Sequence, residues 1–349
     1  MGILVGVMES PWIRSKRWDL GWLVFSVLTV PLAPLMHHYL DMSAEGVATV
    51  IMLLVGGPHV FVTFTRTNMD PKFVRRHRTF TRLAYLVPIA TAAFALYFKA
   101  AFLTFFFTFA SLHVLQQISY VANCYSNRQK LTPTGRERLF EYGVIFSCLY
   151  PFAAVRMVEG TFTLDGTALL VPEFLLGDGL IYAAFAIFAV FLGGWLFYVV
   201  RRHREQRLHY GKTGLIAVTV FATLFTPLFR NLDVAFQGIN TWHCVQYLAL
   251  IWWANRLRRE RGETELAVVR AISERGWKGF ARYYGLAVLA TLGLVGAIYL
   301  AAEIPGVTVL LAYYMLGKGV LLTHYYYDTF LFTQNDELTQ PAPALVTAF

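Results

Sequence analysis

Ten apolar segments run through the chain, each near the length of about 20 residues that an α-helix needs to cross a bilayer core. They lie at residues 19–40, 46–66, 83–99, 101–125, 141–158, 177–200, 213–229, 237–254, 283–303 and 306–332. Charged residues make up only 15% of the chain, against about a quarter in a typical soluble domain. The sequence therefore predicts an all-α fold: a polytopic transmembrane helical bundle of about ten spans, in a single domain over residues 1–349.

The placement of Lys and Arg between these segments predicts a topology. Of the 30 basic residues, 26 lie in five stretches: 1–18, 66–82, 126–140, 201–212 and 255–282. Because cytoplasmic loops are enriched in Lys and Arg, both termini are expected in the cytoplasm, in a multi-pass protein of a cell membrane, the bacterial inner membrane. The net charge of +9 then follows from topology and contact with anionic membrane lipid, and it does not call for nucleic acid.

The basic stretch at 256–282 also shows a helical pattern. Its residues Leu266, Val269, Ile272 and Trp277 are spaced for one helical face. This pattern predicts either an amphipathic helix on the cytoplasmic membrane surface or a solvated connecting helix.

Histidines are the polar residues that stand out within the spans. Three of the nine, His77, His203 and His209, fall in basic loops and are expected at the surface. The other six lie in or at the ends of predicted helices: His37, His38, His59, His113, His243 and His324. An ionisable residue inside a span is costly, so each is a candidate functional residue. His37 and His38 fall near the outer surface unless Pro31 or Pro34 bends the first helix inward.

Four of these histidines are expected at a similar depth. At 1.5 Å per residue, His59 lies about 10 Å, His324 about 12 Å, His243 about 16 Å and His113 about 18 Å from the cytoplasmic end of its helix. Four helices thus bring one imidazole each to the same slab of the membrane, and bundling alone would gather them.

Each of the four also has a polar neighbour on its own helical face, three or four residues further along. These neighbours are Thr63, Gln117, Gln246 and Asp328. A metal-bound imidazole usually donates its other N–H to a carboxylate or amide. Gln117 and Gln246 are therefore predicted to orient ligands at a cofactor site, and Asp328 either to orient His324 or to bind the metal itself.

Lys318 lies within the last predicted span, about 9 Å along the helix from His324. An ammonium at this depth is expected to pair with an acid or to face a cavity. There it would bind an anionic head group or an oxygen intermediate, so we include it with Asp328 among the candidate catalytic residues.

Three interpretations of the histidines remain open at this point: a metal or redox cofactor site, a proton or substrate pathway, and polar contacts that hold helices together. The three cysteines, Cys124, Cys148 and Cys244, form no ligand-spaced pair, which disfavours an iron–sulfur cluster. Neither CxxCH nor HExxH occurs in the chain. Non-haem iron (Fe) is the leading prediction because mixed imidazole and carboxylate ligands suit it, with another transition metal as the alternative.

Two short motifs carry a resemblance to a known family. The sequences GGPH at 56–59 and SLHVLQQ at 111–117 resemble motifs of the bacterial carotene-cleaving dioxygenases called Brp/Blh-like. The resemblance implies an integral-membrane protein that binds iron through histidines of several helices. It covers about a dozen residues and does not extend to WHCVQY at 242–247 or THYYYD at 323–328.

The expected function follows from the site and its surroundings. Aromatic residues form 16% of the chain, and a membrane-depth site walled by them would accept a hydrophobic, lipid-like substrate. We expect an oxygen-dependent oxidoreductase that hydroxylates, desaturates or oxidatively cleaves such a substrate, with a separate cytoplasmic electron donor if one is needed. A proton-coupled transporter and a haem- or quinone-binding electron-transfer protein are the alternatives.

Overall fold

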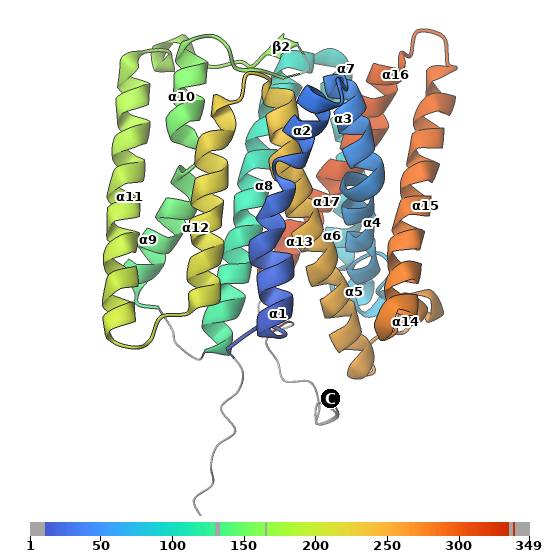
Figure 1. Ribbon diagram of the computed structural model, residues 1–349. Helices are drawn as coiled ribbons and strands as arrows, with labels where there is room; N and C mark the ends of the chain where they lie inside the picture. The colour runs from blue at the N-terminus through green and yellow to red at the C-terminus, as the bar shows by residue number, and fades with distance from the viewer. Residues whose placement is uncertain (1–10, 130–132, 165, 335–337, 339–349) are drawn as a thin grey trace, which may run out of the picture.

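The computed structural model describes residues 11–129, 133–164, 166–334 and 338, and its helices stand side by side in one bundle (Figure 1). Strand is confined, within these ranges, to one hairpin of β1 (Thr163–Leu164) and β2 (Thr167–Ala168). The short helices are α1 (Lys16–Asp19), α2 (Leu32–Tyr39), α3 (Ala44–Ile51), α4 (Gly57–Thr63), α5 (Pro71–Arg76), α6 (Arg78–Ala84), α7 (Leu86–Tyr97), α9 (Gly135–Ser147), α10 (Tyr150–Val158), α14 (Ala267–Ile272), α16 (Val309–Ala312) and α17 (Lys318–Leu331).

Eight helical segments of the described chain are long and apolar enough to cross a membrane. They are α1 to α2 (Lys16–Tyr39), α3 to η4 (Ala44–Arg66), α6 to α7 (Arg78–Tyr97), α8 (Lys99–Arg128), α9 to α10 (Gly135–Val158), α11 (Asp178–Arg204), α12 to η6 (Tyr210–Leu228) and α15 (Gly276–Ala302). The predicted all-α membrane-protein class is thereby confirmed. The number of spans stays a prediction, because two further long segments are less apolar: α13 (Leu232–Glu260) and the run from α16 through η7 (Tyr313–Gly317) to α17.

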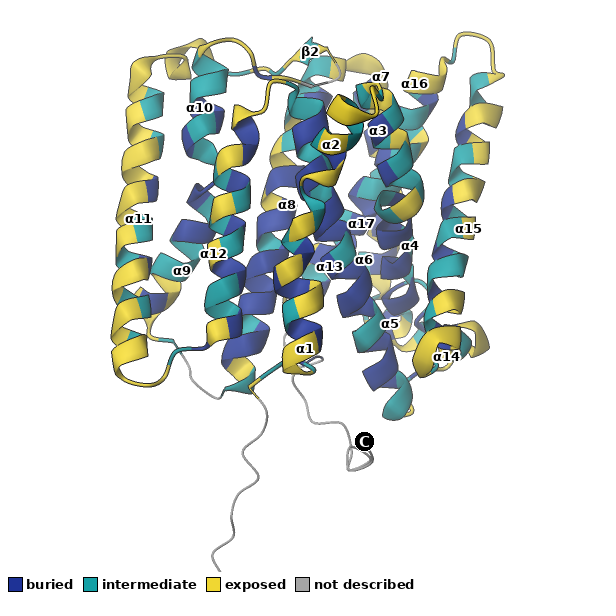
Figure 2. Ribbon diagram, viewed as in Figure 1, coloured by how far each residue is buried: buried dark blue, intermediate teal, exposed yellow. Residues whose placement is uncertain are grey.

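These two less apolar segments lie in the interior of the bundle. Figure 2 shows buried residues concentrated on α8, α13 and α17, whereas α11 and α15 are largely exposed along the periphery. Polar side chains on α13 such as Asn240, His243 and Gln246 are therefore turned toward protein. On α11, by contrast, apolar side chains such as Tyr182 and Phe197 are exposed, as expected of a helix in contact with lipid.

The basic stretches of the sequence gather at one end of the bundle. Figure 1 shows α1, α5 and α14 at this end, which we call the basic end, and the β1–β2 hairpin at the other. The turn between the third and fourth of these segments is tight, since α7 ends at Tyr97 and α8 begins at Lys99.

The segment 256–282 is not a single amphipathic helix. It is divided among the end of α13, the six-residue helix α14 and the start of α15. Gly262 and Gly276, with φ of 72° and 80°, break the helix in the left-handed region that other residues rarely adopt. Val269 and Ile272 are buried, whereas Trp277 is 76% exposed.

One close helix contact depends on a glycine. A Cβ atom on Gly57 would overlap the side chain of Thr291, so α4 and α15 approach each other only because residue 57 has no side chain. This contact fixes the position of α4, which carries His59 two residues further on.

Candidate metal centre

Four histidines from four helices meet in the interior of the bundle. His59 comes from α4, His113 from α8, His243 from α13 and His324 from α17, and none is more than 4% exposed. Their ring centroids form a closed circuit, with spacings of 4.8 Å (His59–His324), 5.0 Å (His324–His113), 5.0 Å (His113–His243) and 5.3 Å (His243–His59). The structure thus brings together the four imidazoles that the sequence places at similar depth.

The ligand atoms of this cluster are spaced for a metal ion. In each of two groups, His59–His243–His324 and His113–His324–Asp328, one ligand atom per residue lies within 4.8 Å of the others. Three ligand atoms bound to one metal at about 2.1 Å lie about 3.4–3.6 Å apart. Joint ligation therefore requires each ligand atom to move inward by less than about 1 Å.

Several buried polar atoms of the cluster have no hydrogen-bond partner among the described residues. They are Nε2 of His59, His113 and His324, both ring nitrogens of His243, and Oδ2 of Asp328. An unpaired buried polar atom costs about 1–3 kcal/mol, so native proteins keep few of them. Five of these six atoms are accounted for if they are lone-pair donors to a cation, because a neutral His243 ring has one lone-pair nitrogen and one N–H.

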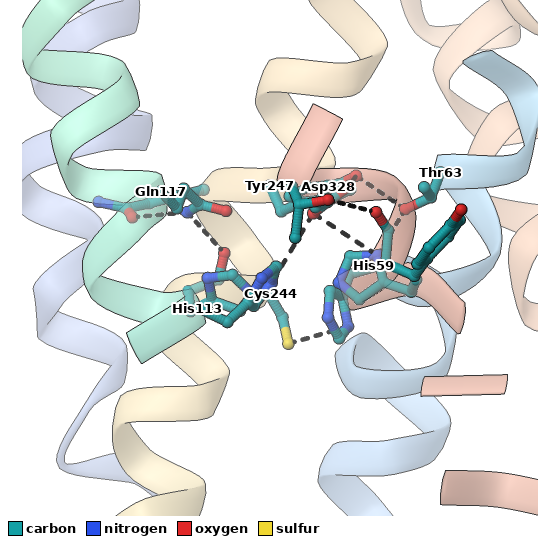
Figure 3. A network of polar contacts seen from close by, with 12 residues as sticks. His59, Thr63, His113, Gln117, Cys244, Tyr247 and Asp328 are labelled. Atoms are coloured by element: carbon teal, nitrogen blue, oxygen red, sulfur yellow. Dashed lines mark hydrogen bonds and ion pairs between the residues drawn. The ribbon is translucent and has the colours of Figure 1, made fainter. Parts of the chain in front are cut away.

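A chain of hydrogen bonds determines which nitrogen of His324 carries its proton (Figure 3). Tyr247 donates its hydroxyl proton to Oδ1 of Asp328 at 2.6 Å. The 2.7 Å contact between Tyr247 and Thr63 must then use the Thr63 proton, and the 2.6 Å contact between Thr63 and Nδ1 of His324 must use a proton on Nδ1. The neutral ring of His324 consequently has its lone pair on Nε2, one of the unpartnered atoms.

His59 is fixed in the same tautomer by different means. Its Nδ1 contacts the carbonyl oxygen of Gly56, which can only accept, so Nδ1 carries the proton and Nε2 the lone pair. His59 lies just after Pro58, which has no N–H to offer, and after a π-helical turn, η3 (Met52–Gly56). The carbonyl of Leu54, four residues before Pro58, accepts a 2.5 Å hydrogen bond from Tyr284 instead.

Asp328 lies within the cluster, between two helices' imidazoles. Its Oδ2 is 3.6 Å from Nδ1 of His324 and 3.7 Å from Nε2 of His113. Thr63, expected to accompany His59 on α4, instead contacts His324 across the helix interface. Thr63 and His59 share a face of α4, but α17 packs close enough for His324 to be the hydrogen-bond partner of Thr63.

The hydrogen bonds of the two glutamines go to groups other than the imidazole rings. Gln117 donates to the backbone carbonyl of His243 at 3.3 Å and to Oε1 of Gln246 at 3.0 Å, and Gln246 donates to the Leu23 carbonyl at 2.6 Å. That Gln117 and Gln246 orient ligands at a cofactor site stays a prediction. They tie α8, α13 and the first span together and position the backbone of His243.

The remaining candidates lie outside the cluster. Lys318 is buried, but it lines an adjoining cavity, with Nζ 3.7 Å from the centroid of the Phe106 ring. His37 and His38 line a separate cavity near the β1–β2 hairpin, where Nδ1 of His37 lies 2.7 Å from the Met42 carbonyl. The bend at Pro31 does not bring either of them to the other imidazoles.

The three loop histidines differ from one another. His203 is exposed and His77 is partly buried, but His209 is buried, contrary to expectation. Nε2 of His209 donates to the Pro11 carbonyl at 2.9 Å, and its Nδ1 accepts from the Lys212 backbone at 3.0 Å. His209 thus caps α12 and anchors the start of the described chain.

Two residues of the site carry no clear signal in the sequence. Tyr247 lies four residues after His243, a spacing that in hindsight places it on the same face. Cys244, which forms no ligand-spaced pair with another cysteine, has its sulfur 3.1 Å from Nδ1 of His59. Of the three consecutive tyrosines, only Tyr325 stacks on the cluster, 4.1 Å from the His113 ring.

Comparison with family models, with curated proteins and with solved structures found no match for this chain. The class of the protein therefore rests on its fold and its site: a helical bundle with membrane-spanning character and a buried cluster of four imidazoles and one carboxylate.

Proposed function

We propose that this cluster binds a transition metal, with non-haem iron as the first choice, and that the protein is a membrane-embedded oxidoreductase that uses oxygen on a hydrophobic, lipid-like substrate. The observation that carries the proposal is the convergence of six buried, unpartnered nitrogen and oxygen atoms from five side chains. Imidazole and carboxylate ligands suit iron, and a bound iron would supply oxygen activation. The resemblance of GGPH and SLHVLQQ to carotene-cleaving dioxygenases supports the same class of reaction.

The protein's own residues would hold and orient the ligands. The relay from His324 through Thr63 and Tyr247 to Asp328 fixes the His324 ring and connects it to a carboxylate through two hydroxyl groups. A proton can pass along such a connected chain. Tyr325 and Phe332 cover the His113 ring and limit the access of water to it.

Metal analysis of purified protein tests the proposal. Protein reconstituted anaerobically with ferrous iron should retain about one equivalent per chain after desalting, and His113→Ala should retain far less. His203→Ala is the matched control, because His203 is exposed. Equal iron in His113→Ala and the wild-type protein, or no iron in either, would contradict the proposal.

Proton-coupled transport is a second candidate, supported by the continuous hydrogen-bonded relay itself. It is distinguished by proton flux into proteoliposomes containing metal-free protein. A Soret band in the absorption spectrum would instead indicate the haem-binding alternative.

A further inference from the structure

A cavity of about 90 Å³ adjoins the histidine cluster on the side away from the basic end. His59 lines it, together with the ammonium-bearing Lys318, the amides Gln237 and Asn240, and the ring of Tyr325. The rest of the lining is largely apolar and includes Met52, Phe61, Phe106, Val320 and Leu321. An apolar cavity with a few convergent polar groups is the usual form of a small-molecule site.

Lys318 is the only lining residue with a full positive charge, and it is 9% exposed. No Asp or Glu lines this cavity, and within the described residues none forms an ion pair with Lys318. Its contacts are with aromatic faces: Nζ lies 3.7 Å from the Phe106 ring centroid and 5.2 Å from that of Tyr313. Such contacts hold an ammonium in place but leave its three N–H donors for another acceptor.

A second hydrogen-bond donor, the amide of Gln237, lines the same cavity as Lys318. The Asn240 amide nitrogen donates to Oε1 of Gln237 at 3.2 Å, and Oδ1 of Asn240 lies 3.6 Å from the Cys244 sulfur, which donates to it. With its oxygen occupied, Gln237 keeps its amide nitrogen available as a donor. The polar part of the lining thus offers positive charge and N–H groups.

Two irregular turns border the same cavity. The π-helical turns η3 (Met52–Gly56) and η7 (Tyr313–Gly317) both contribute residues to the lining of the cavity. The first directly precedes α4, which carries His59, and the second directly precedes Lys318. Single π-helical turns within α-helices occur frequently at functional sites. Here they place one cluster histidine and one buried ammonium on the wall of one cavity.

We propose that this cavity binds the carboxylate end of a lipid-soluble amphiphile, such as a fatty acid or a carboxylated isoprenoid, through Lys318 and Gln237. Lys318 lies nine residues from the start of α16, or about 13 Å into the helix, deeper than the phosphate of a bilayer lipid. A single-chain acid can reach this depth and place its carboxylate beside His59. That the bound acid is a substrate rests on the proposed function, whereas binding of the acid can be measured separately.

Binding of cis-parinaric acid and of its methyl ester, followed by fluorescence at a pH where the acid is ionised, tests this inference. The wild-type protein should bind the acid about 10–100-fold more tightly than the ester, as expected for a charge-assisted hydrogen bond. Lys318→Met should abolish this preference, and Lys318→Arg should retain most of it. Lys99→Met is the matched control, because Lys99 lies over the Tyr314 ring, outside the cavity lining, and should leave the preference unchanged.

Three results would overturn the carboxylate site: equal binding of acid and ester, a preference that survives in Lys318→Met, or tighter binding of lysophosphatidic acid than of the fatty acid. Iron content measured on the same samples separates this inference from the proposed function. Iron-loaded protein without a preference for the acid overturns the carboxylate site alone. A preference that depends on Lys318 in a protein unable to bind iron supports the carboxylate site and contradicts the proposed function.

Discussion

Tyr247 of α13 donates a 2.6 Å hydrogen bond to Asp328 of α17, and both side chains are fully buried. The same hydroxyl accepts from Thr63 of α4, so one oxygen atom joins three helices. The bond from Tyr247 to Asp328 fixes the proton positions along the relay as far as His324. Tyr247 therefore determines the tautomer of this candidate ligand without a hydrogen bond to it.

Removing the Tyr247 hydroxyl should therefore weaken metal binding. In Tyr247→Phe, Asp328 loses its donor and the relay no longer specifies a proton on Nδ1 of His324. We expect about a 10–100-fold loss of iron affinity, the usual effect of removing a group that orients a ligand. Tyr326→Phe is the control, because that hydroxyl donates to the Phe80 carbonyl, away from the cluster. Unchanged iron affinity in Tyr247→Phe would show that the relay does not influence the metal.

Asp328→Asn tests the carboxylate. Asparagine keeps the shape and can still accept from Tyr247, so the protein should fold, but iron retention should fall by about 10–100-fold. Asp178→Asn, at the exposed start of α11, serves as the control. If Asp328→Asn keeps full iron content after desalting, the carboxylate contributes only to packing.

Gly57→Ala should destabilise the protein, because the new methyl group would overlap Thr291 and push α4 from α15. Overpacking of this kind costs about 1–3 kcal/mol of unfolding free energy, measurable as a lower thermal unfolding temperature. Gly21→Ala, in a helix with open space around residue 21, should be neutral or slightly stabilising. Equal stability of the two variants would mean that the α4–α15 contact is not close.

The membrane topology can be tested by labelling single cysteines. All three native cysteines are buried, so background labelling should be low. Gln206→Cys, near the basic end, should react with an impermeant maleimide only after cell lysis, and Ala168→Cys in β2 should react in intact cells. Labelling of both residues in intact cells would refute the cytoplasmic placement of the basic end.

Acid should loosen the contact between α12 and the start of the described chain. Burial lowers the pKa of His209 below its usual value of about 6.5, so the neutral ring is favoured in the folded state. Its stabilisation is complete above the unfolded-state pKa and is lost as the pH falls toward the folded-state pKa. Protonation of Nδ1 would break the bond from the Lys212 backbone.

Unfolding temperatures measured between about pH 7.5 and pH 5.5 check this prediction. The wild-type protein and His203→Gln should both lose stability on acidification, whereas His209→Gln should start lower and lose less. The groups that face His209 are Tyr125, at 4.6 Å between rings, and the Trp12 ring at 5.4 Å, together with Lys212. Equal pH dependence of all three proteins would show that another group titrates.

The sequence predicts the fold class and the meeting of four histidines well, because apolar run length and depth along a helix are one-dimensional properties. It predicts the partners of those histidines poorly. Thr63 and Gln117 are on the expected faces, but they contact His324 and the backbone of His243. Such contacts depend on the rotation and spacing of neighbouring helices, which a helical period alone does not determine.

The prediction for His209 failed for a related physical reason. Its position in a basic loop indicates exposure, but Trp12 packs its ring against His209 from nearly two hundred residues away in the sequence. Tyr247 shows the opposite case. Its spacing from His243 places it on the same helical face, but a tyrosine does not stand out as a site residue in a chain so rich in aromatic residues.

The two long segments that are less apolar than the others, α13 and the run from α16 to α17, supply two of the four imidazoles and the carboxylate. Each places in the interior of the bundle polar side chains that partition poorly into lipid. If both segments span the membrane as predicted, we expect their insertion during synthesis to depend on more apolar neighbours, such as α12 and α15. The histidine cluster would then be complete only after the last of these segments has packed into the bundle, so biogenesis of the bundle and assembly of the site would be one process.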